Sequence, residues 1–393
     1  MKKLILFITL LSVSNSLFSQ WSSHTFEHDQ ENRIYNIYVP EEIDATMPAA
    51  LLLYLHGMEG DELEAENLDL NAFMVEENTI ILSPRAKDFS TIFGSLGNIW
   101  NAGIELYIEL LNEHVAVNEN VDDKGFILSL IEEIKNNHNI DQNKIWIAGF
   151  DAGGYMAQYL ACQEADEFSA IASISGTRAL ALNDCIPNLE IPIAHFHGTA
   201  DTVVNIAGDF VMEPLGALEV GISVDSLINF WKENNNTALD PIITTYEDTN
   251  VDSIHLEHHF YESNGVENRV EHFIIHEGHH EWYDANSQEF DYGQLLWEFF
   301  NRDEVPEGDD NDIAINEISK DKITIYPNPS KDNIQITTEN RVTEVNIYSL
   351  AGKKIKTYKN SNSISLEGLS DNMYFIEILD EYGNIFRQKI LKK

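Results

Sequence analysis

Three polar side chains, each placed just after an apolar run, have the clearest chemical potential in this sequence. Asp151 stands in the middle of GFDAGG, Asp201 follows HFHGTA, and His280 follows FIIHEGH. The order nucleophile, acid and histidine along the chain suits nucleophilic catalysis, since a histidine oriented by an acid can act as a base. We therefore predict a catalytic site made of Asp151, Asp201 and His280.

The segment around Asp151 has the form of a strand, a tight turn and a helix. KIWIAGF is β-branched and aromatic, GFDAGG supplies glycines, and YMAQYLA carries apolar residues at helical spacing. An elbow of the form G-x-S-x-G lifts a serine oxygen above the end of a sheet, but here the central residue is aspartate. Three interpretations stay open: a hydrolase in which Asp151 supports chemistry, a non-catalytic binder, or a single change in an otherwise working enzyme.

Backbone N–H groups near Asp151 are candidates for an oxyanion hole. LLYLHG ends an apolar run, so the N–H of Met58 and that of Ala152 are the predicted donors. The Asp151 carboxylate can itself fold into such a hole, because N–H groups at a helix start attract anions. Carboxylates on both sides of His280 should also raise its pKa and keep it protonated. For ester hydrolysis this replacement should therefore be severe.

The elements that must position these residues alternate between strands and helices across residues 21–302. AALLLYLHG is a continuous apolar run, typical of a buried parallel strand, and DDKGFILSLIEEIKNN reads as an amphipathic helix. EHFIIHEG is predicted as a late strand and YGQLLWEFFNR as the closing helix. This alternation predicts an α/β fold with a mostly parallel sheet covered by helices on both faces.

Both ends of the chain differ from this body. Residues 1–20 run from a basic start through an apolar core to a small, polar exit, which predicts a cleaved signal peptide. Residues 303–320 are acidic and lack periodicity, so they are predicted to be a linker. Residues 321–393 contain short alternating strands broken by turn residues, which predicts a small β-sandwich.

Charge and hydropathy limit the partners of this chain. The net charge is −42, and the excess of acid lies before residue 321. Such an acidic body would repel nucleic acid phosphates, so no nucleic acid partner is expected. After the signal peptide no apolar run is long enough to cross a bilayer, so no membrane span is predicted.

Two cysteines, Cys162 and Cys185, lie shortly after the elbow. An even pair in an exported chain favours a disulfide, and two buried free thiols are the alternative. Neither these cysteines nor any other pattern predicts a cofactor.

The C-terminal segment resembles the sorting domain of the type IX secretion system of Bacteroidetes. The resemblance rests on IYPNPS, VNIYSLAGKKIKT, the ISLEGLS and YFIEI runs, and the basic KILKK end. It implies export across the outer membrane, the secretion machinery as a partner, and a secreted or cell-surface location. In this family the domain is usually removed after export.

The body resembles secreted α/β-hydrolases of the polyhydroxybutyrate depolymerase and feruloyl esterase type. The matching segments are LYLHGMEG, NIDQNKIWIAGFDAGGYMAQYLAC, HFHGTADTVV and HEGHHEW. The resemblance implies His280 as the base, Asp201 as the acid, Asp151 in the place of the serine, and family cysteine positions at Cys162 and Cys185. It implies a secreted carboxylic-ester hydrolase, acting on a polyester or on feruloyl or acetyl esters of plant polysaccharide. A pseudo-esterase that only binds such polymers is the alternative.

Two other kinds of site match parts of this sequence, a carboxylate-nucleophile hydrolase and a zinc site. Haloalkane dehalogenases and epoxide hydrolases use an elbow carboxylate to attack an sp³ carbon, but nothing assigns Trp100 or Tyr155 the supporting roles. HEGHH matches the zinc pattern H-E-x-x-H, yet it follows a strand-like run and contains a glycine, so no metal site is predicted. Most of the seven histidines between His255 and His280 are expected to be exposed, and Ser173 and Ser175 lack an elbow.

Overall fold

The protein is described by a computed structural model, in which two compact units comprise residues 1–309 and 310–393. The described residues are 20–393 except 41–46, 75–77, 92–93, 109–112, 213–215, 247–252, 264, 285–286, 289, 303–305, 307–323, 327–329, 339–340, 349–353, 371–372 and 381–384. The predicted signal peptide and nearly all of the predicted linker therefore lie outside the described residues. No helix among the described residues is long and apolar enough to span a membrane.

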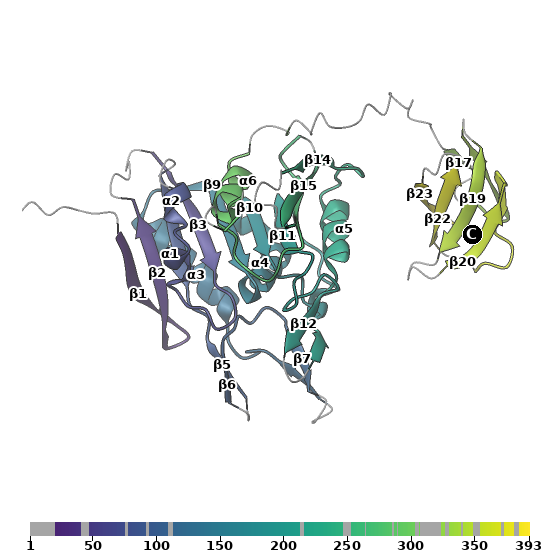
Figure 1. Ribbon diagram of the computed structural model, residues 1–393. Helices are drawn as coiled ribbons and strands as arrows, with labels where there is room; N and C mark the ends of the chain where they lie inside the picture. Colours follow the sequence, from purple (N-terminus) through teal and green to yellow (C-terminus); the bar gives the residue numbers. More distant parts are fainter. Residues whose placement is uncertain are drawn as a thin grey trace, which may run out of the picture. The chain divides into compact units, whose positions relative to one another are not determined.

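A ten-stranded sheet forms the centre of the first unit (Figure 1). Its strands, in spatial order, are β1 (Gln20–His28), β2 (Glu31–Val39), β4 (Thr79–Pro84), β3 (Ala49–Leu55), β9 (Ile140–Phe150), β10 (Ala170–Ile174), β11 (Ile193–Gly198), β16 (Val270–His276), β15 (His255–Tyr261) and β14 (Ile242–Thr245). The six strands from β4 to β16 pair in parallel, and the outer strands at both edges pair antiparallel. The predicted mostly parallel sheet is confirmed.

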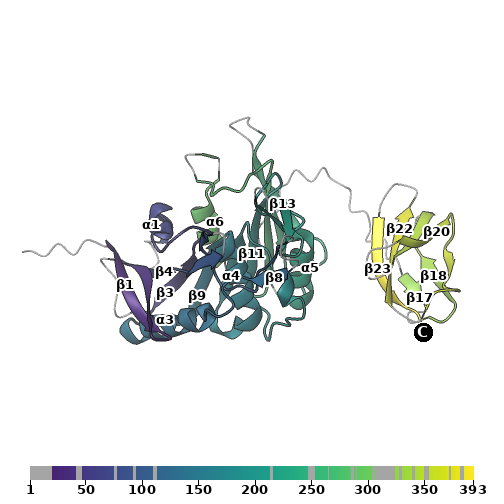
Figure 2. The same ribbon diagram turned by 90° about the horizontal axis from the view of Figure 1, so that it is seen from below.

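Helices cover both faces of this sheet, as Figure 2 shows. One face packs on α3 (Asp123–Asn137), α4 (Ala152–Gln163) and α5 (Val224–Asn234). The other packs on α1 (Glu64–Asn67) and α6 (Tyr292–Phe300), with α2 (Asn71–Met74) against α6. Every residue of β3 is buried, because a parallel strand between two helical layers has no solvent side.

The start of α3 explains two neighbouring aspartates. Asp122 is the N-cap, since its carboxylate accepts the N–H of Gly125 at 2.9 Å. Asp123 is fully buried and forms a 2.6 Å ion pair with Arg33 of β2. The aspartates therefore begin the helix, and the second also ties it to the sheet.

Three small hairpins lie at one edge of the first unit (Figure 1). They pair β5 (Asp88–Thr91) with β6 (Gly94–Asn98), β7 (Glu105–Ile108) with β8 (Glu113–Ala116), and β12 (Asp209–Met212) with β13 (Gly216–Glu219). Two short 3₁₀ turns, Ala165–Glu167 and Leu180–Leu182, complete the elements of this unit within the described residues.

The second unit consists of two antiparallel sheets. One contains β17 (Thr324–Tyr326), β18 (Asn333–Thr337) and β21 (Ser363–Ser365), and the other contains β20 (Lys354–Lys359), β19 (Val342–Tyr348), β22 (Met373–Asp380) and β23 (Ile385–Leu391). Ile334 and Ile364 of the first sheet share one buried core with Val345 and Ile376 of the second. The predicted β-sandwich is therefore confirmed.

Candidate active site

Asp151 lies in a sharp turn between β9 and α4, at the end of the parallel strands. Its φ of 50° is in the left-handed region, where residues other than glycine are strained. A Cβ on Gly149 would lie 2.1 Å from the oxygen of Gly153, and a Cβ on Gly153 would lie 1.9 Å from the oxygen of Leu55. Only glycine fits at these two positions, so the tight turn depends on glycines two residues before and two residues after Asp151.

The carboxylate of Asp151 occupies the place predicted for an oxyanion. The N–H of Met58 donates a 2.7 Å hydrogen bond to Oδ2, and the N–H of Ala152 also bonds this carboxylate. The other oxygen, Oδ1, lies 3.6 Å from Nε2 of His280. The structure thus brings together Asp151 and both predicted donors, with the donors already engaged by the side chain.

His280 lies between two carboxylates. Its Nδ1 is 2.8 Å from Oδ2 of Asp201, whose Oδ1 accepts the N–H groups of Val203 and Val204, each at 2.9 Å. Asp201 is only 4% exposed, so its charge is poorly screened. The structure places Asp201 and His280 side by side, as the order of segments along the chain predicts.

Electrostatics favour a proton on His280. Burial alone would lower the pKa of His280, but the hydrogen bond to Asp201 and the charges of Asp151 and Asp201 outweigh it and raise the pKa. Burial also raises the pKa of Asp151, against the opposing effects of His280 and the two N–H donors. An imidazolium cannot accept a proton from a nucleophile, so a raised pKa of His280 disfavours general base catalysis.

His56 supports the loop that carries the Met58 donor, a role the sequence did not reveal. Its Nδ1 lies 2.7 Å from the oxygen of Gly57, and its Nε2 accepts the N–H of Ala86 at 2.9 Å. Trp100 donates its indole N–H to the backbone oxygen of His56 at 3.0 Å. Burial lowers the pKa of His56 to about 4, so the ring is neutral and serves as a structural brace.

A buried chain of polar side chains ends at the loop of Asp201. It runs from Trp231 through Gln158, Ser173, His195 and His197 to the backbone oxygen of Val204. Each group donates to the next, with distances of 2.7–3.1 Å, provided that both histidines are neutral. Ser173 therefore has a histidine partner but no access, since it is fully buried.

The expected exposure of most histidines between His255 and His280 is wrong. His258 and His272 are buried, at 2% and 9% exposed, and only His279 of the seven is classed as exposed. The reason is that both faces of the sheet are covered here: His258 stacks on Phe273 and His272 lies against His195, with ring centroids 4.3 Å and 6.0 Å apart. His258 lies 2.8 Å from Glu271. Burial alone would raise the pKa of Glu271, but His258, Arg269 and Arg302 outweigh it and lower that pKa to about 2.

A cleft of about 410 Å³ opens beside Asp151 and His280. Its walls are largely apolar and aromatic, with Phe150, Trp282 and Phe210 among the lining residues. A disulfide between Cys162 and Cys185 joins the end of α4 to the segment before β11, so the predicted bridge is confirmed. The cleft and the catalytic candidates therefore belong to one site on a cross-linked scaffold.

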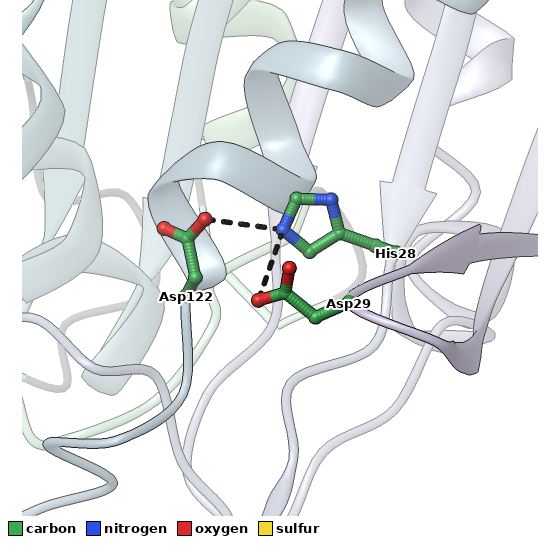
Figure 3. Close-up of side chains that lie close together, drawn as sticks. All are labelled: His28, Asp29 and Asp122. Carbon is green, nitrogen blue, oxygen red and sulfur yellow. Dashed lines mark hydrogen bonds and ion pairs between the residues drawn. The ribbon is translucent and has the colours of Figure 1, made fainter.

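One group among the described residues offers three possible metal ligands: His28, Asp29 and Asp122 (Figure 3). Nε2 of His28 lies 3.1 Å from Oδ2 of Asp122 and 3.8 Å from Oδ2 of Asp29. These contacts already link the turn between β1 and β2 to the N-cap of α3. His276 of the H-E-x-x-H segment ends β16 and lies 3.6 Å from Glu257.

Comparisons with known proteins agree with this fold and this arrangement of segments. Residues 42–214 match the Phospholipase/Carboxylesterase family, and residues 324–393 match the secretion system C-terminal sorting domain. The body is an α/β-hydrolase. Residues 42–214, less than half of the chain, are thus similar to carboxylesterases of that family. The C-terminal match to a type IX sorting domain indicates a secreted or cell-surface location.

Several of the curated relatives are fungal esterases. The bifunctional acetylxylan esterase/xylanase XynS20E of Neocallimastix patriciarum is 25% identical over 174 residues, covering 44% of this chain and 22% of the relative. Feruloyl esterase B of Piromyces equi is 28% identical over 151 residues, covering 38% and 26%. Probable feruloyl esterase C of Aspergillus niger is 29% identical over 187 residues, covering 46% and 59%. The chain spans about a quarter of the first two relatives and 59% of the third.

Proposed function

We propose that this chain is an exported esterase-family protein whose cleft holds carboxylic esters borne by a polymer, and that Asp151 blocks their hydrolysis. The polymers in question are feruloylated or acetylated plant polysaccharide and polyesters such as polyhydroxybutyrate. The observation that carries the proposal is the hydrogen bond from the Met58 N–H to Oδ2 of Asp151, at 2.7 Å. A carboxylate in that place competes with the substrate carbonyl for the same donors.

Two further consequences of Asp151 oppose ester turnover. Attack of its carboxylate on an ester carbonyl would form an anhydride, and it would have to leave the oxyanion donors to do so. Its charge also helps to hold a proton on His280, which must be neutral to act as a base. The pair of Asp201 and His280 and the cleft itself remain intact, so binding of an ester is compatible with this geometry.

The test compares the native chain with Asp151→Ser and Asp151→Asn, using an aryl acetate, methyl ferulate and polyhydroxybutyrate. Loss of a serine nucleophile in a comparable triad costs about a millionfold in kcat, so restoring it should raise ester hydrolysis by at least about a thousandfold. Asp151→Asn is the matched control, because it removes the charge without adding a nucleophile. Equal activity of the native chain and Asp151→Ser on every ester would overturn the proposal.

A second candidate is a hydrolase that uses Asp151 to attack an sp³ carbon. It is favoured by one specific observation: Oδ2 is held by the backbone donors while Oδ1 is turned toward His280. Oδ1 would form the new bond to carbon as the leaving group departs with its electron pair, and Oδ2 would stay in the hole as the ester carbonyl. His280, relieved of one neighbouring charge, would then take a proton from the water that attacks this ester.

This candidate has its own readout. An epoxide that reacts should add its full mass to the native chain at Asp151, a haloalkane should add only its alkyl group because the halide departs, and His280→Ala should trap either adduct. Asp151→Asn should form none. Trp100 is not free for a supporting role, because its indole N–H donates to the His56 oxygen. The Tyr155 hydroxyl accepts a hydrogen bond from Thr177, which does not use its own O–H. An unmodified mass after prolonged incubation with both electrophiles would exclude this mechanism.

A further inference from the structure

A second, more enclosed cavity shares Met58, Asp151 and Phe210 with the open cleft. Its volume is about 30 Å³, and its walls include Ile104, Leu106 and Val117 around the β7–β8 hairpin. Tyr155 of α4 and Val220 close it further. We propose that this cavity is the acyl pocket and that it selects acetyl esters of a large, hydroxyl-bearing alcohol. This inference rests on the proposed function and narrows its substrate class.

The chemistry of ester cleavage decides which cavity receives which half of the substrate. The carbonyl oxygen must lie between the N–H groups of Met58 and Ala152, in the place that Asp151 Oδ2 now occupies. The departing alcohol oxygen must be protonated by His280, so the alcohol belongs in the cleft that His280 lines. The enclosed cavity is lined by Met58 and Ala152 but not by His280, which leaves it for the acyl chain.

The size of the enclosed cavity restricts the acyl group. One water-sized sphere needs about 10–15 Å³ on this measure, so 30 Å³ accommodates about two non-hydrogen atoms. An acetyl methyl group fits, whereas a hydroxycinnamoyl ring does not. The walls are also buried, since Ile104 and Leu106 are 8% exposed and Val117 is 2% exposed within the core, so enlarging the cavity would require repacking.

The open cleft has the opposite character. It is about 410 Å³ in volume, and Phe150 and Trp282 offer flat apolar surfaces beside His280. Glu59 and Glu64 contribute carboxylates to the same lining, and carboxylates accept hydrogen bonds from hydroxyl groups. A sugar ring that carries the acetyl group therefore suits the larger cavity, while a small alcohol such as methanol would leave it mostly empty.

The experiment measures acyl-chain selectivity in full-length Asp151→Ser with aryl acetate, butyrate and octanoate, and with methyl ferulate. We expect kcat/KM for acetate to exceed that for butyrate by at least about tenfold, with octanoate and methyl ferulate lower still. Leu106→Ala should enlarge the acyl pocket and shift the preference toward butyrate. Leu68→Ala is the matched control, because Leu68 lines only the open cleft of the two, and it should leave the acyl preference unchanged.

A milder variant and a binding measurement keep the inference testable if Leu106→Ala fails to fold. Ile104→Val removes one methyl group from the same pocket and should shift the preference in the same direction by a smaller factor. In Asp151→Ala, which frees the oxyanion donors without adding a nucleophile, ligand-detected NMR should show stronger saturation of an acetyl methyl group than of a butyryl methyl group on the same acylated xylo-oligosaccharide.

The possible failures are distinguishable. If Asp151→Ser hydrolyses no ester of any chain length, the proposed esterase site is wrong. If it hydrolyses butyrate, octanoate or methyl ferulate as well as or better than acetate, the acyl-pocket inference is wrong while the esterase site stands. Equal binding of acetyl and butyryl ligands to Asp151→Ala would likewise overturn the inference.

Discussion

His280 and the buried pair His195 and His197 both lie near Asp201, but their pKa values are shifted in opposite directions. His280 follows β16 and lies between the carboxylates of Asp151 and Asp201, which raise its pKa. His195 and His197 lie on β11 in the buried chain, and burial lowers the pKa of both. Residue type alone therefore does not determine the pKa, because the surroundings raise it for His280 and lower it for His195 and His197.

Hydrogen-bond direction explains why Asp201 serves only one of them. Nε2 of His197 lies 3.7 Å from Oδ2 of Asp201 but donates to the backbone oxygen of Val204 at 2.8 Å. The same Oδ2 is 2.8 Å from Nδ1 of His280. The buried chain of polar side chains thus fixes the loop that holds Asp201. The carboxylate of Asp201 itself forms its hydrogen bond with His280.

The largest expected effect separates His280 from its neighbour His279. In the Asp151→Ser background, His280→Ala should lower kcat for an aryl acetate by at least about 10⁴-fold, because it removes the base. His279→Ala is the control, since that side chain is exposed. Steady-state kinetics of both variants test the assignment, and a comparable loss in His279→Ala would show that the catalytic histidine has been misplaced by one residue.

The second prediction concerns the buried chain. His197→Ala should lower the free energy of unfolding by about 2–4 kcal/mol, because it leaves His195 and the Val204 oxygen without their partner and opens a cavity. Urea titration followed by circular dichroism measures this loss. His114→Ala, at a side chain 65% exposed, should change stability by less than about 0.5 kcal/mol. Similar losses of unfolding free energy in His197→Ala and His114→Ala would mean that the buried chain of polar side chains does not stabilise the fold.

The third prediction uses the pH dependence of stability. Since the pKa of His197 is lowered in the fold, the unfolded chain binds a proton below about pH 6.5 that the folded chain does not. The contribution of His197 to the free energy of unfolding is therefore complete above about pH 6.5. It declines as the pH falls, by up to about 1.4 kcal/mol per pH unit. Urea titrations between pH 7 and 5 should give a shallower slope for His197→Asn than for the native chain, and parallel slopes would contradict a neutral His197.

The smallest effect is a change in one titration. Asp151→Asn should lower the pKa of His280, because one of its two neighbouring anions is removed. Imidazole NMR signals measured across the pH range report this shift directly. His195, which is buried and bonds Ser173 and His197, should be unaffected and serves as the internal control. An unchanged His280 titration would mean that Asp151 contributes no charge in the folded state.

Local patterns were enough to predict the elements that hold the site. Gly149 and Gly153 around Asp151 indicated the tight turn, because only glycine allows the close backbone approach. The apolar runs before Asp201 and His280 placed each at a strand end, and parallel strands bring such ends to one edge. The fold class and the order of the three residues followed from these patterns.

Long-range contacts were beyond the reach of the sequence. The brace formed by His56 needs Ala86 and Trp100, and the chain through Ser173 needs side chains from two helices and two strands. No residue spacing along the sequence predicts these contacts between distant segments. The burial of His258 and His272 was missed for the same reason, since it depends on which side chains from other strands cover them, Phe273 and His195 among these.

The sequence by itself determined the α/β-hydrolase body, the sorting domain, the elbow and the aspartate at its centre. Only the tertiary structure decided that the Asp151 carboxylate points into the oxyanion donors, with its second oxygen toward His280. It also decided the sizes of the two cavities beside that residue. Local periodicity and turn chemistry act over a few residues, whereas charge, burial and cavity volume arise where distant segments pack together.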